Sequence, residues 1–162
     1  LPKVDPRPFY LGHPALKYTQ IPARDGKEHG NITRSNRYPN CSFFSNWTSL
    51  GDSITWQVEV PEDGKFRVSL YYTCKEGDEG SVVQLSVGES KLQFEVAEAW
   101  DPPLRGMEED LTPRIESYDK DWKRVDMGTI DLTAGTFYMS LTALEKPGNS
   151  VMDFRLFLFE RI

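Results

Sequence analysis

The chain has 162 residues, 38% of them hydrophobic, and a formal net charge of −6, which together fit one domain with a sizeable core. The acidic balance disfavours a nucleic-acid role that depends on a broad basic surface. No apolar run approaches the length needed to cross a bilayer. We therefore expect neither nucleic acid nor a membrane as a partner.

The first ten residues are rich in proline and are typical of an inter-domain linker. We accordingly expect a linker over residues 1–10 and a single module over residues 11–162. No signal-like segment precedes Leu1. The chain is therefore expected to be a piece of a longer protein whose targeting signal lies elsewhere.

The clearest structural signal is a pair of alternating segments within residues 51–72. Apolar residues at every second position from Ile54 to Val60 mark one face of a half-buried strand. The same alternation returns from Phe66 to Tyr72 after a turn rich in Pro, Asp and Gly. The pattern predicts a β-hairpin of the kind used in sugar-binding β-sandwich modules.

Further strand patterns follow along the chain, whereas amphipathic helix patterns are almost absent. The predicted strands cover residues 81–87, 91–96, 123–127, 129–132, 136–144 and 151–162. A turn at residues 88–90 separates the first two, and residues 156–159 are apolar on both faces, as in a covered central strand. About eight short strands predict an all-β sandwich or jelly roll.

Two long segments interrupt the strand pattern, at residues 23–46 and 97–121. Both are polar, and both contain arginines and aromatic residues. Loops of this length inside a compact domain are usually either functional or disordered. Their aromatic residues, prolines and mixed charges favour ordered loops, which we expect to carry the function.

Catalytic patterns are weak. Glu108, Glu109 and Asp110 are adjacent and cannot by themselves flank a glycosidic bond, and Glu98 or Asp101 would need a distant partner. The two histidines do not occur in a nucleophile motif, and no His or Cys cluster has metal-ligand spacing. The sequence therefore predicts a non-catalytic chain, with a small glycan hydrolase as an alternative.

Cys41 and Cys74 permit one disulfide, although two buried free thiols are an equal alternative. Asp153 occurs in an otherwise apolar strand, where a buried carboxylate needs an arginine partner or a metal. Calcium suits carboxylate and carbonyl ligands, so Asp153 is a candidate ligand of a structural calcium ion. We expect no other cofactor.

Aromatic and arginine residues in the loops are the stronger functional signal. Sugar rings stack on flat aromatic side chains, and arginine forks suit sulfate or carboxylate groups. The alternative is that the aromatics cover the end of the sandwich and the arginines pair with nearby acids. The predicted ligand-binding residues are Arg34, Arg37, Asn46, Trp47, Trp100, Asp101, Arg105 and Tyr118.

Several blocks of the sequence carry a resemblance to a known family: residues 30–35, 39–42, 46–48, 51–56, 101–106, 116–118 and 151–155. Together they resemble the C-terminal accessory domain of bacterial formylglycine-dependent sulfatases, in a likeness that covers most of the chain from Leu11 onward. The resemblance implies a galactose-binding-like sandwich, related to carbohydrate-binding modules, in a secreted or periplasmic enzyme acting on sulfated glycans. The sulfatase nucleophile lies in a Cys-x-Pro-x-Arg or Ser-x-Pro-x-Arg segment, and neither Cys41 nor Cys74 matches it, so we expect the catalytic part to be absent from this chain.

The sequence thus predicts a non-catalytic module that binds an anionic or sulfated glycan. A module that only packs against the catalytic domain of its enzyme is the second interpretation, because interfaces also use Trp and Arg clusters.

Overall fold

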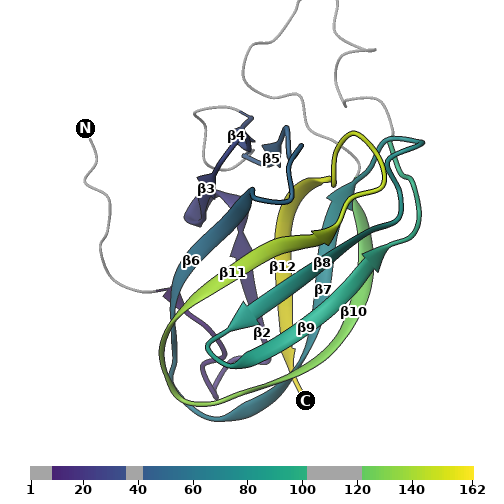
Figure 1. Cartoon of the computed structure of the whole chain (residues 1–162). Coiled ribbons are helices and arrows are strands. Elements are labelled where there is room, and N and C mark those ends of the chain that lie inside the picture. Colours follow the sequence, from purple (N-terminus) through teal and green to yellow (C-terminus); the bar gives the residue numbers. More distant parts are fainter. Residues whose placement is uncertain (1–8, 36–41, 102–121) are drawn as a thin grey trace, which may run out of the picture.

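The computed structural model describes residues 9–35, 42–101 and 122–162, which form a two-layer β-sandwich (Figure 1). Its strands are β1 (Phe9–Tyr10), β2 (Tyr18–Pro22), β3 (Lys27–His29), β4 (Thr33–Arg34), β5 (Phe44–Ser45), β6 (Ser53–Val60), β7 (Gly64–Thr73), β8 (Ser81–Val87), β9 (Ser90–Val96), β10 (Lys123–Leu132), β11 (Gly135–Glu145) and β12 (Asp153–Arg161). One short 3-10 helix, η1 (Ala23–Asp25), follows β2. In the part of the chain that the structure describes, no helix is long and apolar enough to span a membrane. The predicted all-β sandwich is confirmed.

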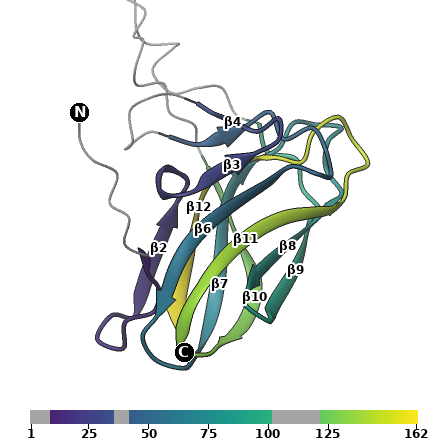
Figure 2. The same cartoon turned by 60° about the vertical axis from the view of Figure 1, so that its left-hand side comes forward.

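The strands form two sheets. Sheet A has the order β1-β6-β11-β8-β9, with β3 also pairing with β6, and sheet B has the order β10-β7-β12-β5-β4, with β2 also pairing with β12. The β1–β6 pair is parallel, and the other described pairs are antiparallel. Figure 2 shows the two layers from a second side. Because Phe9 and Tyr10 already pair with β6, the sandwich begins within the stretch predicted to be a linker.

The predicted hairpin over residues 51–72 is wrong. Its two strands exist as β6 and β7, but β6 pairs with β11 in sheet A and β7 pairs with β10 and β12 in sheet B. The turn at residues 61–63 therefore carries the chain from one sheet to the other. Alternation identifies which face of a strand is buried but not which strand is its neighbour. Both strands bury their apolar faces in the same core.

Other strand predictions hold with smaller changes. β8 and β9 form an antiparallel hairpin from Ser81↔Val96 to Val87↔Ser90, as the turn between them predicts. The two short strands predicted over residues 123–132 are one strand, β10, with an irregularity between Asp126 and Gly128. Gly128 has a φ of 117°, and its N–H donates to the Asp126 carboxylate at 2.8 Å. This local bulge explains why the alternation breaks there.

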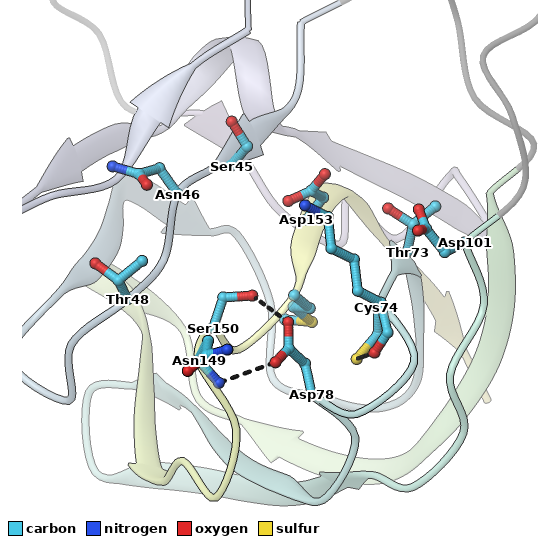
Figure 3. Close-up of a pocket in the computed structure, with 12 residues that line it drawn as sticks. Ser45, Asn46, Thr48, Thr73, Cys74, Asp78, Asp101, Asn149, Ser150 and Asp153 are labelled. Carbon is cyan, nitrogen blue, oxygen red and sulfur yellow. Dashed lines mark hydrogen bonds between the residues drawn. The ribbon is translucent and has the colours of Figure 1, made fainter.

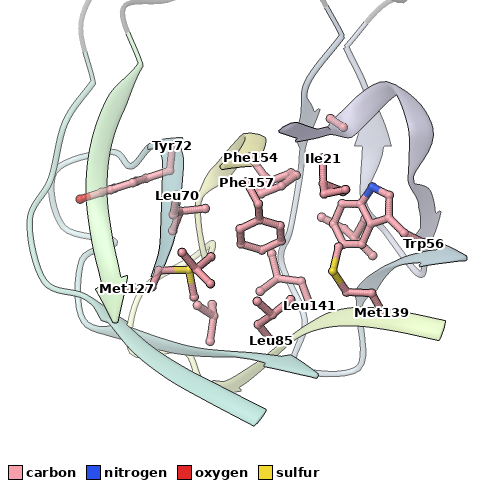
Figure 4. Packing of buried hydrophobic residues seen from close by; sticks show 14 of the residues in the cluster. Ile21, Trp56, Leu70, Tyr72, Leu85, Met127, Met139, Leu141, Phe154 and Phe157 are labelled. Atoms are coloured by element: carbon pink, nitrogen blue, oxygen red, sulfur yellow. The ribbon is translucent and has the colours of Figure 1, made fainter. Parts of the chain in front are cut away.

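The core lies between the sheets and is rich in aromatic rings (Figure 4). The Trp56 ring of sheet A contacts Phe154 and Phe157 of sheet B at centroid distances of 5.6 and 5.7 Å. β12 is central in its sheet, as predicted, but only its inward residues are fully buried. Leu156 and Leu158 on the outer face are half-buried, so the predicted cover on both faces is incomplete.

Candidate functional site: a pocket at the loop end

A pocket of about 450 Å³ lies at the end of the sandwich where the chain enters β12 and leaves β7 (Figure 3). We call this end the loop end. The pocket is lined by Ser45, Asn46, Thr48, Thr73, Cys74, Lys75, Asp78, Asp101, Asn149, Ser150, Met152 and Asp153. These residues come from four segments: the end of β5 and the loop after it, the end of β7 and the loop after it, the segment after β9, and the loop that enters β12.

Asn46 and Thr48 form one wall of the pocket, opposite Asp101 in Figure 3. Trp47 between them is 1% exposed and packs in the core, while its carbonyl oxygen accepts a 2.8 Å hydrogen bond from the Val151 N–H. Asn46 has a φ of 59°, a left-handed conformation that asparagine tolerates better than most residues. Trp47 therefore anchors the segment in the core and leaves its two polar neighbours at the pocket.

The facing wall is fixed by the segment that precedes Asp101. Cys74 and Trp100 exchange two backbone hydrogen bonds of 2.8 Å each. The Tyr72 hydroxyl donates to the Glu98 carbonyl at 2.8 Å, and burial, followed by the charges of Cys74 and Glu98, raises the pKa of Tyr72 to about 12. These contacts tie residues 98–101 to the end of β7.

Asp78 joins two of the four segments. Its carboxylate accepts hydrogen bonds of 2.9 Å from the Asn149 N–H and from the Ser150 hydroxyl (Figure 3). Burial opposes ionisation of this carboxyl, but the hydrogen bonds from Asn149 and Ser150 and the charge of Lys75 outweigh it and lower the pKa. Asp78 is therefore ionised at neutral pH and holds the loop before β12 against the loop after β7.

The described lining is rich in hydrogen-bond acceptors. It contains the carboxylates of Asp78, Asp101 and Asp153, with Lys75 as its basic residue. Burial, and then the negative charges of Asp78, Glu79, Asp153 and Asp101, raise the pKa of the Cys74 thiol to about 12. The thiol is thus uncharged at neutral pH, which makes it a poor nucleophile. Amides and hydroxyls beside carboxylates suit a ligand with many hydroxyl groups.

The structure brings together three residues predicted from sequence. Asn46, Asp101 and Asp153 line the pocket, Trp47 lies buried behind it, and Trp100 lies beside Asp101 without lining the pocket. Trp100 is 42% exposed, and the Lys123 ammonium lies 5.4 Å from its ring centroid.

Arg34, also predicted to bind ligand, is occupied inside its own loop. Its guanidinium donates to the carbonyls of Gly26 at 2.8 Å and Ala23 at 3.4 Å and lies 4.8 Å from the Phe44 ring centroid. It does not belong to the described pocket lining. The predicted ligand residues Arg37, Arg105 and Tyr118 lie outside the residues that the structure describes.

The predicted disulfide and calcium site gain no support. Cys74 is a buried free cysteine whose thiol lies 3.7 Å from the Val151 carbonyl oxygen, and its candidate partner Cys41 lies outside the described residues. Asp153 is half-buried at the start of β12 rather than in its interior. Across residues 9–35, 42–101 and 122–162, no group of three His, Cys, Asp or Glu residues could hold a metal ion, so calcium stays a prediction.

Sequence reasoning missed most of the pocket. The residues not singled out are Ser45, Thr48, Thr73, Lys75, Asp78, Asn149, Ser150 and Met152. Asn149 and Ser150 occur in a short polar run between two strands, a composition shared by ordinary turns. The sequence does not reveal that both residues line the pocket, because the hydrogen bonds that bring their loop to Asp78 form only in the folded chain.

Comparison with known proteins identifies the fold. No protein-family model and no curated protein matches the sequence. A native family 35 carbohydrate-binding module from Clostridium thermocellum matches with a TM-score of 0.59 and 14% identity over 89% of this chain and 98% of the module. The module CBM6cm-2 of Cellvibrio mixtus lichenase 5A, solved with cellotriose, matches with a TM-score of 0.57 and 10% identity over 89% of this chain and 97% of the module.

The mosquito-larvicidal Cry4Aa toxin of Bacillus thuringiensis also contains this fold, with a TM-score of 0.63 and 13% identity over 98% of this chain and 25% of the toxin. The chain therefore has the β-sandwich fold of these carbohydrate-binding modules. At these identities the likeness establishes the fold, and the function has to be argued from the site.

Proposed function

We propose that the chain is a non-catalytic carbohydrate-binding module of a secreted glycan-active enzyme, and that the loop-end pocket holds the glycan. The observation that carries the proposal is the pocket itself, which combines amide, hydroxyl and carboxylate groups from four separate segments. Hydrogen bonds between those segments preorganise the pocket, as binding of a polar ligand requires. The modules that share the fold support a sugar as the ligand.

The described lining favours glycans without negative charge, because its three carboxylates face one basic residue, Lys75. The sequence-based expectation of an anionic or sulfated glycan depended on arginines, and Arg34 is engaged in its own loop. A sulfated ligand and a sulfatase parent remain proposals that depend on the sequence resemblance and on Arg37 and Arg105.

The test is binding to a panel of soluble glycans by affinity electrophoresis, followed by calorimetry with any glycan that retards the protein. The panel pairs neutral β-glucan, xylan and mannan with a sulfated galactan and a polyuronate. Asn46→Ala and Asp101→Ala should each weaken binding about tenfold, because each removes a hydrogen-bonding group from the pocket.

Tyr138→Ala is the control, because this side chain is 74% exposed on β11 and does not line the pocket. Its affinity should equal that of the wild type. The proposal is wrong if no glycan retards the protein, or if the pocket variants bind as tightly as the wild type. Stronger retention by the sulfated galactan than by the neutral glycans would support the anionic alternative.

Packing against the parent's catalytic domain is a second candidate, favoured by Trp100. An exposed tryptophan beside the pocket is the kind of anchor that protein interfaces use. Trp100→Ala should then weaken association of this module with the separately produced catalytic domain and leave glycan affinity unchanged. Lower glycan affinity in this variant would instead assign Trp100 to the sugar site.

A further inference from the structure

Asp52 is a buried carboxylate that lies outside the described pocket lining but is linked to it. Only 3% of the residue is exposed. Its Oδ1 accepts a 3.0 Å hydrogen bond from the Asn31 N–H, and its Oδ2 accepts from the N–H groups of Thr48 at 3.3 Å and Ser49 at 3.2 Å. One carboxylate thus holds the turn between β3 and β4 against the loop after β5.

Both segments lead directly to the pocket wall. The Asn31 carbonyl accepts a 2.8 Å hydrogen bond from Asn46 Nδ2, and Asn31 Nδ2 lies 3.4 Å from the Thr48 hydroxyl. Asn46 and Thr48 are the polar side chains of that wall (Figure 3). Asn46 is therefore linked to the Asp52 carboxylate through Asn31, whereas Thr48 donates its own N–H to that carboxylate.

The hydrogen bonds at position 52 require a carboxylate rather than an amide side chain. Its two oxygens accept from different segments, whereas an asparagine would turn a donor NH₂ toward the N–H groups of one of them. Burial of the charge is offset because charge-assisted hydrogen bonds to backbone N–H groups are strong.

Gly30 also shows how closely this carboxylate is packed. Its φ is +80°, and a Cβ atom there would collide with the Asp52 side chain, with the carboxyl carbon only 2.8 Å away. Glycine at position 30 therefore leaves the space that the Asp52 carboxylate occupies.

We infer that Asp52 is a positioning residue for the glycan pocket: it sets the orientation of Asn46 and Thr48 through backbone hydrogen bonds without touching the ligand. The inference rests on the proposed function and names a residue that controls its affinity. It predicts that loss of the Asp52 charge weakens glycan binding in protein that is still folded.

The experiment compares Asp52→Asn with Asp63→Asn by calorimetry, using the neutral glycan bound best by the wild type. Asp63 also accepts a backbone hydrogen bond, from the Ala134 N–H at 2.6 Å, but it lies in the turn after β6, at the far end of β7 from the pocket. Asp52→Asn should lose about tenfold in affinity at a temperature where circular dichroism shows it folded, and Asp63→Asn should lose none.

A double-mutant cycle separates positioning from a general effect on folding. If Asp52 acts through the wall, the combined variant Asp52→Asn with Asn46→Ala should lose less affinity than the two single losses multiplied. Fully multiplicative losses, or wild-type affinity in Asp52→Asn while Asn46→Ala is weakened, would overturn the inference. If Asp52→Asn does not fold, Gly30→Ala replaces it, because its Cβ would push the Asp52 carboxylate away from the Asn31 N–H, and wild-type affinity in that variant would contradict the inference.

Amide hydrogen exchange gives a readout that needs no glycan. The Asn31, Thr48 and Ser49 amides should exchange about tenfold faster in Asp52→Asn than in the wild type. If the wild type binds no glycan, the proposed function fails, and unchanged exchange at these amides would then reject the positioning role as well.

Discussion

Asp78 shows how a single carboxylate holds the pocket together. It is 8% exposed and accepts two hydrogen bonds from the loop that enters β12. Its pKa is lowered from 3.8 in the folded protein, so folding favours the ionised form. The stabilisation is complete above the unfolded pKa and is lost as the pH falls through the lower folded pKa.

Asp78→Asn should therefore lower the free energy of unfolding by about 2 kcal/mol at neutral pH, because it weakens charge-assisted hydrogen bonds. The difference from the wild type should shrink once the pH falls below 3.8, the unfolded value. Urea unfolding of both proteins at neutral and acidic pH measures it. Asp126→Asn, on an exposed part of β10, is the control and should cost less. If the difference in unfolding free energy between Asp78→Asn and the wild type stayed constant at acidic pH, the ionised Asp78 carboxylate would not be its cause.

Among the elements, the loop between β11 and β12 depends on close backbone contact. A Cβ atom on Gly148 would lie 2.6 Å from the Asp78 Cα and 2.9 Å from the Gly77 carbonyl oxygen. Because backbone atoms cannot rotate away, a larger residue at this position would push the two loops apart.

Gly148→Ala should consequently weaken glycan binding about tenfold and destabilise the fold by about 1–3 kcal/mol. Gly51→Ala is the matched control, since its Cβ would lie 3.8 Å from the nearest atom, the Ser49 hydroxyl oxygen. Calorimetry measures the glycan affinity of the two variants, and urea unfolding measures their stability. Equal behaviour of Gly148→Ala and Gly51→Ala would show that this contact does not shape the pocket.

For the whole molecule, stability depends on the aromatic core shared by the sheets. Phe157 is fully buried and contacts both Trp56 and Phe154, at centroid distances of 5.7 and 4.8 Å. Phe157→Ala should lower the free energy of unfolding by about 3–5 kcal/mol, as other large core truncations do. In contrast, Tyr138→Ala should stay within about 0.5 kcal/mol of the wild type. Urea unfolding monitored by tryptophan fluorescence tests both values, and a small loss for Phe157→Ala would mean that the core repacks.

The sequence by itself determined the fold class and the buried faces of the main strands. Residues such as Trp56 and Val58 alternate with polar neighbours because a half-buried strand exposes every second side chain. Two pocket residues, Asn46 and Asp101, could also be selected, because polar residues in or beside loops are frequent in binding sites. A third, Asp153, could be selected for another reason, as a carboxylate in an otherwise apolar strand. These are local properties, and a local pattern is sufficient to reveal them.

Tertiary structure alone decided which strands pair and which loops meet. β6 and β7 are consecutive yet belong to different sheets, and Asp78 meets Asn149 from 71 positions away in the chain. Strand pairing and loop contacts depend on the packing of the entire core, and single-chain periodicity contains no information about partners. The link from Asp52 to the pocket could not be predicted for the same reason. A carboxylate beside a strand has no distinguishing sequence pattern, and its three backbone donors come together only in the folded chain.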